Sequence, residues 1–146
     1  MPDRVADALH DVDVILHAGD VCVPAVLDEL STLAPVHAVL GNNDGSDVAD
    51  RGVPDTLELE LAGVHVAMIH DSGPRQGRAG RMRRRFPHAD LVVFGHSHIP
   101  WDTEDDGQRL FNPGSPTDKR RQPHGTVGRL ELAAGRIVSA SFVQVS

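Results

Sequence analysis

Five polar side chains follow apolar segments of the sequence, each near the point where a strand would end. Asp20 follows VILHAG, Asn42 follows HAVLG, His70 follows VHVAMI, and His96 and His98 follow LVVFG. Ligands of α/β proteins bind at the carboxyl ends of the strands, so we expect these donors to converge on one site. Carboxylate, amide and imidazole groups together suit Mn²⁺, Fe²⁺, Co²⁺, Ni²⁺ or Zn²⁺, and the lack of thiolates argues against a structural zinc site.

Each of these motifs also has a simpler explanation when it is taken alone. Asp20 could be a turn or helix-cap residue, and residues 42–44 before Gly45 are ordinary turn formers. His96 and His98 would lie on the same face of a strand without necessarily binding anything. The order and spacing of the whole set favour the ligand interpretation.

The apolar patterns predict the elements that must position these residues. Period-two alternation over residues 56–70 predicts a hairpin with one buried face. Apolar residues at helical spacing predict a helix after Pro24, and Met82 with Phe86 predicts one or two helical turns within residues 75–86. The remaining predictions are a helix before the first strand, strands at 12–17, 35–40 and 89–98, and a closing strand pair within 126–145.

The composition is that of an ordinary globular protein and suits a single domain over residues 1–146. A net charge of −7 argues against a nucleic acid duplex as partner, because duplex binding relies on clustered positive charge. Cys22 is the only cysteine, which excludes an intrachain disulfide and indicates a cytoplasmic protein. The sequence contains neither a secretory signal nor an apolar run of the roughly 20 residues that a membrane span needs.

The ordered motifs resemble those of a known family. Residues 19–20 (GD), 41–44 (GNND), His70, 95–98 (GHSH) and 112–116 (NPGSP) resemble the calcineurin-like metallophosphoesterase superfamily, more narrowly its small YfcE-type phosphodiesterases. The resemblance implies an α/β fold, a four-layer α/β/β/α sandwich. It also implies a divalent-metal-dependent phosphoesterase, and we expect a phosphodiesterase. In such an enzyme a metal-activated hydroxide would attack the phosphorus of a small phosphate ester.

The same resemblance assigns metal-binding roles residue by residue. Asp20 would bridge two metal ions, Asn42, His70 and His96 would complete one site, and His98 would serve the other. Mn²⁺ is the expected metal, with Ni²⁺, Fe²⁺, Co²⁺ and Zn²⁺ as alternatives. Two ions held about 3.5–4 Å apart would lower the pKa of a shared water and neutralise phosphoryl oxygens.

Two departures from the family pattern predict impaired activity. The sequence lacks the Asp-x-His strand that precedes the GD motif in the family, so the first central strand would be missing and one ion could be held instead of two; a natural start upstream of Met1 is the alternative. Asn43 stands where the family has a His that protonates the leaving group, and an amide cannot do so at neutral pH. Asn43 and Asp44 therefore remain the candidate catalytic positions, with Asp44 expected to orient its neighbours and activated diesters expected to react best.

The sequence also leaves a non-catalytic role open. The same fold could serve as a metal-binding or protein-interaction scaffold of the Vps29 kind. The arginines of residues 75–85 could receive a phosphate-bearing substrate or form a solvated helix face, and Trp101 could line the pocket or the core. His17 and His37 are expected in the core. No substrate-binding residue is assigned, and an unfilled strand position would favour a homo-oligomer.

Overall fold

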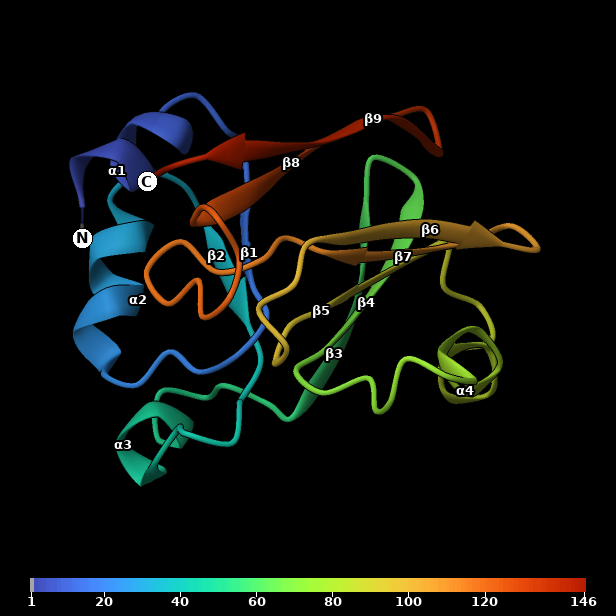
Figure 1. Ribbon diagram of the computed structural model, residues 1–146, viewed down its shortest axis with the longest axis horizontal. Coiled ribbons are helices and arrows are strands. Elements are labelled where there is room, and N and C mark those ends of the chain that lie inside the picture. The colour runs from blue at the N-terminus through green and yellow to red at the C-terminus, as the bar shows by residue number, and fades with distance from the viewer. Residues whose placement is uncertain (1) are drawn as a thin grey trace.

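Two β-layers lie face to face, with helices on the outer side of each (Figure 1). This computed structural model describes residues 2–146. Val66, Met68, Val93 and Phe111 form the buried centre between the layers. The predicted α/β/β/α sandwich of the metallophosphoesterase type is confirmed.

One layer is a five-stranded mixed sheet. Its order is β3-β4-β5-β7-β6, with bounds β3 Thr56–Leu61, β4 Val64–Ile69, β5 Leu91–Phe94, β6 Trp101–Asp105 and β7 Gln108–Asn112. The strands β4, β5 and β7 are parallel, and β3 and β6 pair antiparallel at the two edges. Ile69 lies opposite Phe94, so β4 and β5 end level with each other and deliver their next residues to the same edge.

The other layer consists of two separate strand pairs. The parallel pair is β1 (Ile15–His17) with β2 (Val36–Ala38), and the antiparallel pair is β8 (Thr126–Ala133) with β9 (Arg136–Gln144). Within residues 2–146 no backbone ladder joins the two pairs. The expectation that a first central strand is missing stays a prediction.

The helices cover apolar strand faces. Their bounds are α1 Asp3–Ala8, α2 Pro24–Ser31, α3 Ser46–Ala49 and α4 Arg78–Arg85. Leu30 of α2 packs on Ile15, while Met82 of α4 and Phe86 pack on the outer face of the five-stranded sheet, as the sequence predicted. None of the helices within residues 2–146 has the length and apolar character that crossing a membrane requires.

The prediction of one strand over residues 89–98 is wrong at its end. The strand β5 stops at Phe94, and the backbone of His96 (φ 70°) and His98 (φ 61°) is left-handed. Extended backbone cannot accommodate such φ values, so the alternation rule that would have put both imidazoles on one strand face does not apply. The hairpin β6–β7 and the short α3 were not predicted.

Candidate metal centre

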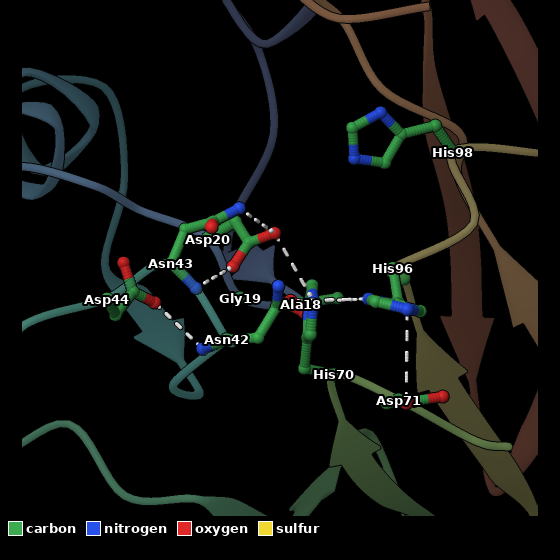
Figure 2. Close-up of polar contacts among 12 residues, drawn as sticks. Ala18, Gly19, Asp20, Asn42, Asn43, Asp44, His70, Asp71, His96 and His98 are labelled. Atoms are coloured by element: carbon green, nitrogen blue, oxygen red, sulfur yellow. Dashed lines mark hydrogen bonds and ion pairs between the residues drawn. The ribbon is translucent and has the colours of Figure 1, made fainter. Parts of the chain in front are cut away.

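Four of the predicted ligands meet where the two β-layers end (Figure 2). Asp20 follows β1, Asn42 follows β2, His70 follows β4, and His96 follows β5. The backbone N–H of Gly95 donates to the carbonyl of His70 at 2.9 Å, which continues the pairing of β4 with β5 beyond their last residues. Strand ends from both layers therefore set the positions of these side chains.

The side-chain atoms of this group approach one another closely. His70 Nε2 lies 2.8 Å from Asn42 Oδ1 and 3.3 Å from Asp20 Oδ2. His96 Nδ1 lies 3.2 Å from Asn42 Oδ1 and 3.3 Å from His70 Nε2. Ligand atoms that share one divalent ion, with bonds of about 2.1 Å, are separated by about 3.0–3.4 Å, so these spacings fit a common cation.

The tautomer of His70 leaves a metal-binding lone pair in the site. Its Nδ1 lies 2.8 Å from the carbonyl oxygen of Ala18, which can only accept, so Nδ1 carries the proton and donates it. The neutral ring then presents a lone pair at Nε2, where it faces the oxygen of Asn42, the carboxylate of Asp20 and Nδ1 of His96. A divalent ion among these atoms would accept the lone pair of Nε2 together with those of the two oxygens.

Asn42 is central to the fit. Among residues 2–146, His, Cys, Asp and Glu side chains alone form no group of three that could hold a metal ion. The Asn42 oxygen lies next to both imidazoles and turns the set of Asp20, His70 and His96 into four converging donors. Carboxylate, amide and imidazole donors together fit a divalent ion of the Mn²⁺ to Zn²⁺ series.

Asn43 and Asp44 contact the loops of the site. The backbone N–H of Asn43 donates to Asp20 Oδ1 at 2.9 Å, and its side-chain amide donates to Asp20 Oδ2 at 3.2 Å. Asp44 accepts from the backbone N–H of Cys22 at 2.6 Å and from that of Gly41 at 2.8 Å. Asp44 thus ties the loop after β1 to the loop after β2, and Asn43 orients the carboxylate of Asp20.

His98 is not part of the cluster, although the sequence grouped it with the other four. Its side chain stands apart in Figure 2, and its Nδ1 lies 2.5 Å from the carbonyl oxygen of Asp118 and 3.7 Å from Asp118 Oδ2. Asp118 belongs to a loop that follows β7. The residues next to His98 in the sequence give no indication of this contact. These contacts use Nδ1 of His98 and leave its Nε2 without a polar contact within residues 2–146, so they do not exclude the predicted role of His98 at a second metal ion.

The site leaves no room for side chains at two of its glycines. A Cβ on Gly19 would lie 2.5 Å from Nδ1 of His70, and Gly19 itself has a left-handed φ of 104°. A Cβ on Gly41 would overlap the backbone and carboxylate of Asp20. Asp20 (φ 57°) also has a left-handed backbone, a conformation that costs of order 1–3 kcal/mol and is concentrated at functional sites.

Asn112, the first residue of the NPGSP motif, is a buried residue of the site to which the sequence assigned no role. Its side-chain amide donates to the carbonyl of Gly95 and to Ser97 Oγ, both at 3.2 Å, and its oxygen accepts from the backbone N–H of Gly114. These bonds hold the loop that carries His96. The available signal was an asparagine ending the apolar run RLFN, because a fully buried amide at that point must find partners.

A shallow cavity of about 400 Å³ opens beside the cluster. Asn42 and His70 form one wall, and the remaining lining includes Asp55, Asp71 and Arg85. Asp71 Oδ2 also lies 4.0 Å from Nε2 of His96. The metal-ligand candidates are therefore accessible to a small molecule from this side.

Comparisons with known proteins agree with the fold and the motifs. Residues 1–135 match the calcineurin-like phosphoesterase superfamily domain. A probable metallophosphoesterase of Methanothermobacter thermautotrophicus is 38% identical over 122 residues, covering 82% of this chain and 70% of that protein.

Solved structures extend the likeness to the whole chain. Vps29 of Entamoeba histolytica, solved in complex with zinc, has a TM-score of 0.78 at 22% identity and covers 100% of this chain and 91% of its own. A structure described as a novel archaeal phosphodiesterase has a TM-score of 0.70 at 21% identity and covers 95% and 87%. At these identities the two structures establish the fold alone.

The first prediction concerns the close approach at Gly41. Gly41→Ala should lower the free energy of unfolding by about 1–3 kcal/mol and weaken Mn²⁺ binding at least about tenfold, because the methyl group must displace Asp20. Chemical denaturation and calorimetric titration with Mn²⁺ measure the two effects. The matched control is Gly80→Ala in α4, where the added methyl would meet only the flexible end of Arg84. Equal Mn²⁺ affinity in Gly41→Ala and wild type would contradict the geometry.

The second prediction concerns His17, which accepts a hydrogen bond from the N–H of Gly19 at 3.3 Å. Burial lowers the pKa of His17, and the nearby carboxylates of Asp44 and Asp20 oppose this only in part. The unfolded chain therefore takes up a proton below about pH 6.5 that the folded chain refuses, and stability falls as the pH drops from there to the lowered pKa. In chelator-treated protein, His17→Asn should lose stability less steeply over this window in urea titrations; identical slopes would refute the assignment.

Proposed function

Because the chain belongs to the calcineurin-like phosphoesterase superfamily, we propose that it is a divalent-metal-dependent phosphodiesterase. The observation that carries the proposal is the arrangement at His70, whose unprotonated Nε2 faces Asn42 Oδ1, Asp20 Oδ2 and His96 Nδ1 within 3.3 Å. A phosphoesterase reaction needs positive charge at this point to receive an anionic substrate. The protein as a whole is acidic, with a net charge of −7, and cannot supply that charge from its average surface.

Asp20, Asn42, His70 and His96 would hold the ion, and their oxygen and nitrogen donors suit a divalent ion such as Mn²⁺, with Ni²⁺, Fe²⁺, Co²⁺ and Zn²⁺ as alternatives. A divalent ion bound there would lower the pKa of water and neutralise phosphoryl oxygens. In the reaction one P–O ester bond breaks as water adds to phosphorus, giving a phosphomonoester and an alcohol. The archaeal phosphodiesterase of the same fold supports this reaction class.

The chain's own residues orient the donors. Asn43 holds both oxygens of Asp20, the carbonyl of Ala18 fixes the ring of His70, and Asn112 fixes the loop before His96. None of these groups can protonate a leaving alkoxide, since Asn43 ends in an amide. We therefore propose that activity is strongest on esters whose leaving group departs as a stable anion and is impaired on alkyl diesters.

The charge, the composition and the strand pairing support proposals about the substrate, the cellular location and the oligomeric state. We propose a small phosphate ester rather than a nucleic acid duplex as the substrate, and a cytoplasmic location for a chain with a single cysteine. The strand pairs β1–β2 and β8–β9 each keep unpaired edges within residues 2–146, which supports association into a homo-oligomer.

A second candidate function is a non-catalytic scaffold that binds a metal ion or a protein. One observation favours it: Asn43, whose amide cannot give up a proton at neutral pH, occupies the position expected for a proton donor. The scaffold and the enzyme differ in one measurable respect, which is whether metal binding at His96 supports turnover.

The third prediction tests this difference. With Mn²⁺ present, wild type should hydrolyse bis(p-nitrophenyl) phosphate, and His96→Ala should lower kcat/KM by about 100-fold or more because a donor of the cation is lost. His88→Ala is the matched control, since His88 is an exposed histidine away from the cluster. Equal rates in wild type and His96→Ala would remove the catalytic proposal and leave the scaffold.

The fourth prediction concerns the missing proton donor. Asn43→His should raise kcat on a diester with an alkyl leaving group by about tenfold or more, while the rate on the p-nitrophenyl diester should change little, because only poor leaving groups need protonation. Parallel assays of the two substrates give the ratio. A ratio unchanged from wild type would mean that position 43 does not face the leaving group.

A further inference from the structure

Two arginines lie against aromatic rings next to the metal centre. The guanidinium carbon of Arg78 lies 4.7 Å from the centre of the Phe94 ring and 5.0 Å from that of Trp101. Arg75 lies 5.0 Å from the same Trp101 ring. Cation–π contacts of this kind hold a guanidinium in place without neutralising its charge. The two positive charges are therefore fixed in position and remain available to an anion.

The guanidinium of Arg78 has unused hydrogen-bonding capacity. Its Nε is buried and has no hydrogen-bond partner within residues 2–146, and its one side-chain bond is a long contact of 3.4 Å from a terminal nitrogen to the carbonyl of Gly73. A buried donor without a partner costs free energy that a ligand can recover. Burial, together with the charges of Arg81 and Arg75, lowers the pKa of Arg78, and Asp71 opposes this.

Arg81 has a different task. Its guanidinium donates to the carbonyls of Ser72 at 2.7 Å, Pro74 at 3.1 Å and Gln76 at 3.0 Å. These bonds fold the segment between β4 and α4 around Arg81 and so position Arg75 at its end. Arg81 therefore stabilises the loop, whereas within residues 2–146 Arg78 makes a single long side-chain hydrogen bond and Arg75 makes none, so both guanidinium groups have donors left for another partner.

The arginine pair adjoins the residues that hold the cation. Phe94 immediately precedes Gly95 and His96, and Trp101 begins the strand that follows the loop carrying His96. Asp71 lies near both the metal-ligand candidates and the arginine pair. Its carboxylate is 4.0 Å from His96 Nε2, and its negative charge raises the pKa of Arg78 against the lowering by burial. Asp71 is thus close to both the cation donors and Arg78, and a substrate arm that passes Asp71 would reach the arginine pair.

We propose that Arg75 and Arg78, held against Trp101 and Phe94, form a subsite for a second anionic group of the substrate. This inference rests on the proposed phosphodiesterase function and narrows its substrate class to diesters that carry a phosphate or similar anion on the arm beyond the scissile phosphate. Two fixed guanidinium groups match the oxygens of such an anion and favour it over a neutral arm.

The kinetic test compares two p-nitrophenyl diesters that differ only at the far end of a propyl arm, where one carries a hydroxyl and the other a phosphonate. In the presence of Mn²⁺, wild type should prefer the phosphonate-bearing substrate about tenfold or more in kcat/KM. Arg78→Met and Arg75→Met should each remove most of this preference while changing kcat/KM for the hydroxyl substrate less than about twofold. Arg84→Met is the control, because it removes one charge from an exposed position of the same helix.

A binding test separates the subsite from catalysis. Trp101 is the only tryptophan of the chain, so its fluorescence reports on the arginine pair directly. Inorganic phosphate added to chelator-treated protein should give a saturable change in wild type and Arg84→Met, and affinity at least about tenfold weaker in Arg78→Met, with chloride at equal ionic strength as the blank.

The outcomes distinguish the two proposals. Wild type that hydrolyses neither substrate but binds phosphate at Trp101 would overturn the phosphodiesterase and support the anion subsite. Hydrolysis of both substrates at equal rates, or losses of equal size on both substrates in Arg78→Met, would overturn the subsite and leave the phosphodiesterase standing.

Discussion

The hydrogen bond from Nδ1 of His70 to the carbonyl of Ala18 is the contact on which the site depends. It joins the end of β4 in one β-layer to the loop after β1 in the other, so it brings the two layers together at the edge where the donors lie. It also determines which ring nitrogen carries the proton, and thereby leaves a lone pair at Nε2 facing the oxygens of Asp20 and Asn42. One hydrogen bond therefore both connects the two layers and turns Nε2 of His70 towards the other metal-ligand candidates.

Much of this arrangement could be predicted from the sequence, because apolar runs that end in a polar residue mark strand ends. Because ligands of α/β proteins bind at the carboxyl ends of the strands, the sequence alone predicted that Asp20, Asn42, His70 and His96 lie at one edge. The side chain of His98 lies apart from these four, since β5 stops at Phe94 and a left-handed backbone turns the chain towards Asp118, and its assignment to a second metal ion stays a prediction. Contacts with a loop 20 residues away leave no local trace in the sequence.

The features that the sequence did not predict have equally physical causes. The strand β6 (WDTED) is mostly exposed at the sheet edge, so it lacks the alternation or apolar run that announces a strand. The pairing of Arg78 with Phe94 and Trp101 joins residues from a helix and two different strand ends, which only the fold can bring together. The sequence suggested both a phosphate-receiving and a solvated role for this arginine run, and their shared contact with Trp101 distinguishes Arg75 and Arg78 from the other arginines of the run.

The most direct measurement of the central claim is the protonation and metal-binding state of the His70 ring. Long-range ¹H–¹⁵N correlation spectra of the histidine side chains, recorded at neutral pH before and after addition of Zn²⁺, report both nitrogens separately. We predict that His70 keeps its proton on Nδ1 throughout, and that the Nε2 signal of His70 and the Nδ1 signal of His96 shift together at one equivalent of Zn²⁺. A proton on Nε2 in the neutral ring, or Zn²⁺ that leaves both signals unchanged, would contradict this role of His70.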